Sequence, residues 1–257
     1  MTIGTPTVGY ASVNGIEMYY ESHGIDGPPL VILHGGAQTI DLSFAALLPA
    51  LTARRRVIAV EFQGHGHTAD TDRDMSLELF SDDVVALLDR LGIARADLLG
   101  YSLGGLVALR TAVRHPERVD RLVLVSTHYR HDGYYAEITA PEQTSERLPT
   151  EDDFKAMVEA YARVAPDPTR FEATLARLQP LAHGFVEWTE DELRAITAPT
   201  LLVLGDTDFI RLEHAVRMYE LIPNARLAVL PGTTHMGAIT RADLLIPMIE
   251  AFAPTNP

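Results

Sequence analysis

Short, continuously apolar segments alternate along this chain with longer segments whose apolar residues recur every three or four positions. The apolar runs predict strands buried on both faces, at residues 30–33, 56–60, 96–99, 121–125, 200–204 and 226–230. The helical period predicts amphipathic helices at residues 44–51, 76–91, 103–115, 212–222 and 241–252. Strands that alternate with helices at this spacing predict crossover connections and a mostly parallel sheet.

The N-terminal residues follow a different pattern, in which apolar and polar positions alternate. Residues 8–21 predict two short strands joined at Asn14-Gly15, because both central positions of such a turn tolerate a positive φ. These two strands can join the sheet only as an antiparallel edge. The expected fold class is therefore α/β, with a mostly parallel eight-stranded sheet flanked by helices.

The alternation of strands and helices is interrupted between residues 127 and 198. Strand-like runs disappear there, and helical segments are predicted near 151–164 and 168–178. We expect a helical cap at 127–198 and a core made of residues 1–126 and 199–257. Ligands bind beyond the carboxyl ends of the strands in an open parallel sheet. The insertion begins at that end, directly after the strand at 121–125, so it is expected to form a lid.

The composition excludes several classes of protein. Of 257 residues, 47% are hydrophobic and 22% are charged, which is typical of a globular domain. Lys and Arg number 21 against 35 Asp and Glu, and the formal charge of −14 argues against a surface for nucleic acid or an anionic membrane. The absence of cysteine excludes a disulfide, a thiolate metal site and a cysteine nucleophile. The N-terminus lacks the pattern of a secretory signal and no apolar run approaches the ~20 residues of a membrane span, so a cytoplasmic protein is expected.

The segment at 96–110 carries the clearest chemical signal. An apolar run is followed by Gly100, Ser102 and Gly104 in a G-x-S-x-G pattern, and a predicted helix begins directly afterwards. This context places a serine hydroxyl on a tight turn, beside the amides of a helix N-terminus. A glycine-rich turn that only packs closely is the structural alternative. The amides suit an anion that forms beside the serine, which a structural turn would not need, so Ser102 is predicted to be a nucleophile.

A serine hydroxyl needs a base, and the base needs an acid that orients it. Among ten histidines, His235 follows the last predicted strand within P-G-T-T-H-M-G, at the carboxyl end of the sheet. Asp206 and Asp208 follow the preceding strand, within L-G-D-T-D-F. The order serine, aspartate, histidine along the chain is the one expected when the nucleophile lies on a strand–turn–helix. The pattern predicts a triad of Ser102, His235 and one of the two aspartates.

Two backbone amides are expected to form an oxyanion hole. One belongs to Leu103, the residue after the predicted nucleophile, and the other to Gly36, in the loop after the strand at 30–33. Glycine in the His34-Gly35-Gly36 segment lets the backbone approach a substrate closely. A plain loop after a strand is the alternative interpretation.

With these residues, the chain resembles the α/β-hydrolase superfamily and, within it, the capped serine esterase-like branch. The resemblance rests on H-G-G at 34–36, E-F-Q-G-H-G at 61–66, G-Y-S-L-G-G at 100–105, G-D-T-D at 205–208 and the terminal His235. It implies Ser102 as the nucleophile and His235 as the general base. It also implies Asp208 as the acid, because this family commonly places its acid three residues after the glycine that ends the strand.

Three comparisons with the family pattern refine this resemblance. Some relatives place the acid after the preceding strand, where this chain has Ser126 and Thr127 and no carboxylate. Relatives that dehalogenate or open epoxides use an aspartate nucleophile, and Ser102 argues against both activities. The turn at 61–66 usually opens with Asp and has Glu61 here; we interpret this turn as structural.

The resemblance implies hydrolysis of a carboxylic ester through an acyl-enzyme, with a small-molecule ester or related carbonyl compound as the substrate. The alternatives with the same triad are hydrolysis of a carbon–carbon bond in a vinylogous diketone, lactone hydrolysis and peracid formation. A non-catalytic small-molecule-binding relative is the alternative from another class. No metal ion and no cofactor are expected, because the histidines lack ligand spacing and no dinucleotide fingerprint follows the early strands. The oligomeric state is left open.

The substrate pocket is expected to draw on both the core and the insertion. The candidate pocket residues are Gly35, Tyr101, Tyr129, Trp188 and Met236. The start of the insertion is rich in His and Tyr, at His128, Tyr129, His131, Tyr134 and Tyr135. We interpret this cluster as partly solvated cap surface, with a pocket wall as the alternative. Trp188, the one tryptophan of the chain, either anchors the cap or walls the pocket.

Overall fold

One mixed sheet runs through the centre of the molecule. The computed structural model describes residues 6–24, 27–140, 145–183 and 187–254. The strands are β1 Thr7–Val13, β2 Ile16–His23, β3 Leu30–Leu33, β4 Val57–Val60, β5 Ala96–Tyr101, β6 Val119–Val125, β7 Thr200–Gly205 and β8 Ala225–Leu230. Their order across the sheet is β1-β2-β4-β3-β5-β6-β7-β8. From β4 to β8 all neighbours pair in parallel, so the expected eight-stranded, mostly parallel sheet is confirmed.

The predicted N-terminal hairpin is confirmed as the antiparallel edge of this sheet. β1 pairs with β2, and β2 pairs in turn with β4, both in antiparallel register. The chain reverses at Asn14 and Gly15, whose φ angles are 43° and 87°. Positive φ at both central positions is the geometry that matches the right-handed twist of the two strands.

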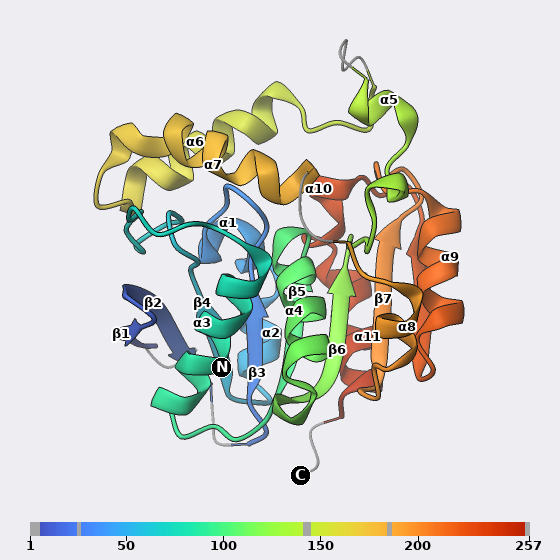
Figure 1. Cartoon of the computed structure of the whole chain (residues 1–257), viewed down its shortest axis with the longest axis horizontal. Helices are drawn as coiled ribbons and strands as arrows, with labels where there is room; N and C mark the ends of the chain where they lie inside the picture. The colour runs from blue at the N-terminus through green and yellow to red at the C-terminus, as the bar shows by residue number, and fades with distance from the viewer. Residues whose placement is uncertain (1–5, 25–26, 141–144, 184–186, 255–257) are drawn as a thin grey trace.

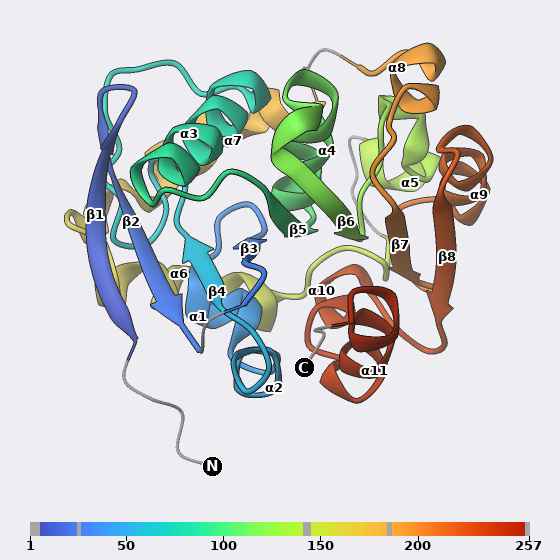
Figure 2. The same cartoon turned by 90° about the horizontal axis from the view of Figure 1, so that it is seen from below.

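Helices cover both faces of the sheet (Figure 2). On one face lie α3 Leu77–Arg90, α4 Leu103–Arg114 and α9 Leu212–Leu221, and on the other lie α2 Leu48–Thr52 and α11 Ala242–Phe252. Alternate residues of β3 divide between these faces. Val31 and Leu33 pack with α3 and α4, while Leu30 and Ile32 pack with α11. Burial on both faces explains why this strand is continuously apolar.

Local capping decides where the helices begin. Ser76 caps α3 as its hydroxyl accepts a hydrogen bond from the amide of Leu79 at 3.1 Å. The prediction of one helix at 44–51 is wrong, because two short helices occupy this region, α1 Ile40–Phe44 and α2. The side chain of Thr39 caps α1 four residues earlier than the predicted start. Pro49 lies in the first turn of α2, where a missing N–H costs nothing, so a new helix starts there.

The insertion after β6 passes over the carboxyl ends of the strands, as Figure 1 shows. Its elements are the 3₁₀ turn η2 His131–Gly133, α5 Ala136–Thr139, α6 Glu151–Val164, η3 Pro168–Arg170 and α7 Phe171–His183. The bounds of α6 agree with the prediction. α7 extends past the predicted end at residue 178 and includes Pro180.

The last part of the insertion packs differently. α8 Glu190–Arg194 lies beside α9, and Arg217 of α9 bonds Glu190 at 2.7 Å. Two further elements complete the core, η1 Pro116–Arg118 and α10 His235–Ala238. We retain 127–198 as the proposed cap, with α8 as the segment through which the chain returns to the flank of the sheet.

Ion pairs tie the cap to a loop of the core. The side chain of Asp70 is fully buried and binds Arg170 at 3.0 Å and Arg177, both from the cap. Arg177 also donates to the carbonyl of Thr71 at 2.7 Å. Burial alone would raise the pKa of Asp70, but hydrogen bonds from Arg170 and Arg177 lower it below its ordinary value. The carboxylate is therefore charged and fully engaged at neutral pH.

Candidate active site

Ser102 occupies a strained turn between β5 and α4. Its φ and ψ are 52° and −116°, a conformation that costs energy in a non-glycine residue. The flanking glycines are required by close packing of the backbone. A β-carbon at Gly100 would overlap the carbonyl of Gly104, and one at Gly104 would overlap the carbonyl of Leu33. The turn therefore presents a half-buried serine at the carboxyl end of the sheet.

His235 and Asp208 meet Ser102 from two other loops at the same end of the sheet. Nε2 of His235, at the start of α10, lies 3.0 Å from Oγ of Ser102. Nδ1 of the same ring lies 2.9 Å from Oδ1 of Asp208, in the loop after β7. Asp206 is turned away and accepts a hydrogen bond from the amide of Thr233 at 3.1 Å. The geometry thus brings the three residues of the implied triad together and leaves Asp206 outside.

Asp208 is held as a carboxylate despite complete burial. Its Oδ2 accepts a hydrogen bond from the hydroxyl of Ser126 at 2.6 Å, and Oδ1 accepts one from the amide of Ile210 at 3.0 Å. Burial by itself would raise the pKa of Asp208. The electrostatic interaction and hydrogen bond with His235, together with these two hydrogen bonds, outweigh burial and lower the pKa of Asp208 below its ordinary value.

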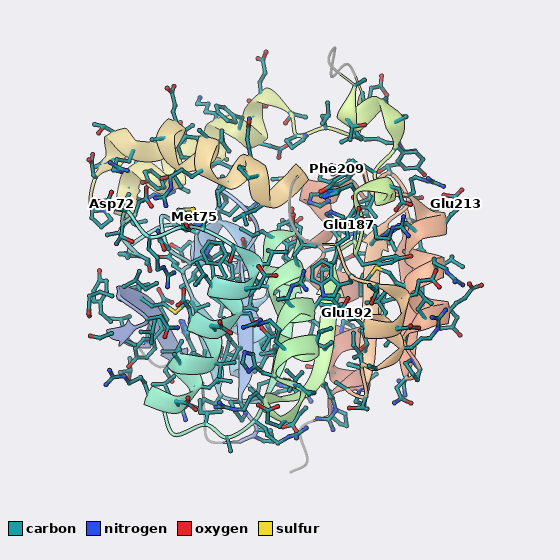
Figure 3. The ribbon with its side chains drawn as sticks, viewed as in Figure 1. Asp72, Met75, Glu187, Glu192, Phe209 and Glu213 are labelled. Carbon is teal, nitrogen blue, oxygen red and sulfur yellow. The ribbon has the colours of Figure 1, made fainter. Side chains whose placement is uncertain are left out.

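Two aromatic residues hold His235, one through its ring and the other through its backbone. The ring of Phe209 stacks on it with centroids 3.7 Å apart and an interplanar angle of 18°. The hydroxyl of Tyr101 donates to the backbone carbonyl of His235 at 3.2 Å. Figure 3 shows Phe209 between the cap helices and the ends of the strands. Stacking and backbone anchoring together restrict the ring to the orientation that joins Ser102 to Asp208.

Gly36 and Leu103 lie close together beside Ser102. A side-chain carbon at position 36 would be 3.7 Å from Cβ of Leu103. Leu103 is the first residue of α4, so its amide is one of the four that a helix N-terminus leaves without a helical acceptor. Such amides suit developing negative charge. The structure therefore brings the two predicted oxyanion residues to the same side of the serine.

Two buried, neutral histidines hold the loop that contains Gly36. Nε2 of His34 accepts a hydrogen bond from the amide of Phe62 at 3.2 Å, and Nε2 of His65 accepts one from the amide of Ala37 at 3.1 Å. Burial lowers the pKa of His34 well below its ordinary value and that of His65 to about 4. Both rings can therefore act as acceptors at neutral pH, a role that the sequence analysis did not assign to them.

Glu61 fixes the turn at 61–66 from inside. Its carboxylate accepts hydrogen bonds from the amide of Ile40 at 3.1 Å and from the amide of His67 at 2.6 Å. The side chain is 1% exposed, so it does not face a substrate. These contacts agree with the structural interpretation of this turn.

A cavity of about 410 Å³ opens beside Ser102, between the core and the cap. Of the predicted pocket residues, Gly35, Tyr101 and Met236 line it, together with Gly36 and Leu103. The volume lies within the range of small-molecule sites. The cap contributes apolar side chains to the wall, from Pro149, Phe154, Met157, Leu175, Leu178 and Leu181.

The predictions that Tyr129 and Trp188 line the pocket are wrong. Tyr129 is turned onto α9, where its ring stacks on His214 at 4.4 Å and its amide donates to Nε2 of that histidine at 3.2 Å. Trp188 is 1% exposed within the core, with the guanidinium of Arg110 4.1 Å above its ring. The two rings therefore pack the insertion against α9 and α4.

The sequence analysis did not assign several residues that line the cavity. His128 and Tyr134 belong to the His- and Tyr-rich start of the insertion and line the wall, rather than forming solvated surface. Their rings lie 4.4 Å apart. Phe209 and Gln38 line the cavity as well. Phe209 had one available signal, its position directly after Asp208.

Among the described residues, no group of three or more His, Cys, Asp or Glu side chains is arranged to hold a metal ion. In the same part of the chain, no helix has the length and hydropathy that a membrane span requires.

Known proteins are similar to this chain in sequence and fold. A family model described as alpha/beta hydrolase fold matches residues 28–153. The pimeloyl-[acyl-carrier protein] methyl ester esterase of Photobacterium profundum is 31% identical over 88% of this chain and 94% of its own length. The 2-hydroxymuconate semialdehyde hydrolase of Pseudomonas putida is 29% identical over 88% of this chain and 87% of its own. A carboxylesterase structure from Bacillus subtilis has a TM-score of 0.79 at 20% identity, covers 97% of this chain and 92% of its own, and so shares the fold.

Proposed function

The chain belongs to the alpha/beta hydrolase fold family, and on that premise we propose that it is a serine hydrolase that cleaves carboxylic esters through an acyl-enzyme. The observation that carries this proposal is the pair of contacts made by His235. Its ring lies 3.0 Å from the hydroxyl of Ser102 and 2.9 Å from the carboxylate of Asp208, at the wall of the cavity. A nucleophile, a base and an orienting acid within hydrogen-bond reach are the requirements for acyl transfer.

In the first half of the reaction, His235 removes the proton of Ser102 as the serine oxygen attacks the ester carbonyl. Asp208 keeps Nδ1 of His235 protonated and stabilises the imidazolium that forms. The amides of Gly36 and Leu103 bind the oxyanion, and each such donor lowers the barrier by about 3 kcal/mol. His235 then passes its proton to the leaving alcohol, and the acyl-enzyme remains.

In the second half, a water molecule attacks the acyl-enzyme and gives up a proton to His235. The tetrahedral intermediate collapses, the acid leaves and Ser102 recovers its proton. The strained turn at Ser102 supports both halves, because it presents the serine at the N-terminus of α4 without further rearrangement.

A second candidate is hydrolysis of a carbon–carbon bond. The identity to the 2-hydroxymuconate semialdehyde hydrolase of Pseudomonas putida favours it, and the same three residues would serve. Lactone hydrolysis and peracid formation also require only this triad, and a binding protein without turnover could keep the same residues.

Two measurements test the proposal. A fluorophosphonate should label the protein at Ser102, and Ser102→Ala should abolish both the label and the turnover of 4-nitrophenyl esters. Undiminished turnover by Ser102→Ala would overturn the assignment. Labelling without turnover of any ester, lactone or vinylogous diketone would support the binding protein instead.

A further inference from the structure

The cavity beside Ser102 has an uncharged lining. None of the described residues that line it is Asp, Glu, Lys or Arg. Apolar side chains form much of its cap side, among them Leu175 and Leu178 from α7 and Met157 from α6. Leu178 and Met157 are themselves buried, at 6% and 8% exposed. This wall offers a substrate dispersion contacts and no counter-ion.

The polar groups on the wall are neutral as well. Outside the triad these are the side chains of Gln38, Gln179, Tyr101, Ser126, Tyr134 and His128. Of these six, His128 could gain a positive charge. It is 3% exposed and lies against the ring of Tyr134. Burial holds the pKa of His128 well below its ordinary value, and the neighbouring His214, His235 and His131 lower it further.

The arginines of the cap that approach this region are engaged elsewhere. Arg147 donates to the backbone carbonyl of Asp208 at 2.7 Å, and its guanidinium lies 4.3 Å above the ring of Tyr135. Arg170 and Arg177 bind Asp70 in the core loop. None of these three side chains is part of the cavity wall.

We propose that this cavity selects esters whose buried portion is an uncharged hydrocarbon chain and rejects substrates that bring a carboxylate into the cavity. The inference rests on the acyl-transfer function proposed for Ser102. A carboxylate that leaves water for a site without a cation loses far more solvation energy than neutral hydrogen-bonding groups return. This selection distinguishes a hydrolase of esters with uncharged acyl chains from a hydrolase of substrates that carry a carboxylate, such as muconate-like acids.

A matched pair of substrates tests the selection. Mono-4-nitrophenyl adipate and its methyl ester share the scissile bond, the leaving group and the carbon chain between the two carboxyl groups. They differ at the far end, where the free acid carries one negative charge and the methyl ester an uncharged methyl group. The methyl ester is expected to have a kcat/KM at least about tenfold higher at pH 7.5, because only the free acid must be desolvated. A ratio below tenfold would overturn the inference.

A pair of variants tests the cause. Gln179 lines the cavity yet is exposed, so either charge can be placed there without disturbing the core. Gln179→Lys should raise the relative kcat/KM for the free acid at least about fivefold, and Gln179→Glu should lower it. If the ratio of kcat/KM for the free acid to that for the methyl ester is the same in both variants and the parent protein, the uncharged wall does not cause the selection.

The labelling of Ser102 separates the two proposals. If a fluorophosphonate labels Ser102 and both adipates react equally, the selection fails and the proposed function stands. If Ser102 is not labelled and neither ester reacts, the proposed function fails before selectivity is measured.

Discussion

The hydroxyl of Ser126 donates a 2.6 Å hydrogen bond to Oδ2 of Asp208, the carboxylate oxygen that does not face His235. Ser126 directly follows β6 and has a φ of 53°, and its amide donates to the carbonyl of Val203 on β7. The two neighbouring strands thus fix the orientation of the buried carboxylate through one side chain.

Removal of this hydrogen bond should impair the triad without removing any of its members. Ser126→Ala is expected to lower kcat/KM for a 4-nitrophenyl ester about tenfold or more, because a hydrogen bond to a charged group contributes about 1.5–3 kcal/mol. The pKa of Asp208 should rise in this variant, so the acidic limb of the pH profile should move to higher pH. Thr111→Ala is the matched control, since it removes a buried hydroxyl that bonds Ser81 outside the site. An unchanged pH profile in Ser126→Ala would contradict the positioning role.

The two aspartates after β7 should differ sharply in their effect on turnover. Asp208→Asn is expected to lower kcat by about 10⁴-fold, because an amide favours the wrong tautomer of His235. Asp206→Asn removes the negative charge but keeps an oxygen that can accept from the amide of Thr233, so its turnover should stay within a few-fold of the parent protein. Steady-state kinetics with one activated ester measures kcat for both variants. A larger loss of kcat in Asp206→Asn than in Asp208→Asn would identify Asp206 as the acid of the triad.

Buried histidines should make the fold sensitive to mild acid. Burial lowers the pKa of His65 from 6.5 to about 4, and that of His214 likewise to about 4. Between pH 4 and pH 6.5, these histidines are therefore protonated in the unfolded chain and remain neutral in the folded protein. Stability should be complete above pH 6.5, fall as the pH drops toward 4 and level off below.

The expected loss between pH 7 and pH 5 is about 2 kcal/mol for each of these two histidines. Urea unfolding at the two pH values measures it. His65→Gln removes one of the two titrating groups. It should therefore reduce the loss of unfolding free energy between pH 7 and pH 5 by the contribution of one histidine. An equal pH dependence in the variant and the parent protein would exclude His65 as a source.

The ion pairs of Asp70 should stabilise the cap more than an exposed pair would. Asp70→Asn leaves Arg170 and Arg177 without their buried carboxylate and is expected to cost about 3 kcal/mol of unfolding free energy. It should also speed proteolytic cleavage within the cap. Asp120→Asn is the control, because Asp120 pairs with Arg95 on the surface and such pairs contribute about 0–1 kcal/mol. Equal effects of the two substitutions would show that the buried pair has no special role in holding the cap.

The sequence by itself determined the sheet, the position of the serine turn and the order of the three candidate residues. These features are local. A strand buried on both faces must be continuously apolar, and Ser102 can occupy its turn only with glycine at positions 100 and 104. The glycine and serine positions of the motif therefore predict the geometry of the turn. The bounds of β3, β7 and α6 lie within one residue of the predicted bounds.

Only the tertiary structure decided which side chains surround the serine. His128 and Tyr129 are adjacent, yet His128 lines the cavity and Tyr129 stacks on His214 of α9. Ser126 meets Asp208 across 82 positions of chain. Such contacts depend on how the insertion packs against the sheet, which is set by the summed fit of many side chains. No local period or motif encodes that fit, because neighbouring residues in an irregular segment can face opposite directions at little cost in backbone energy.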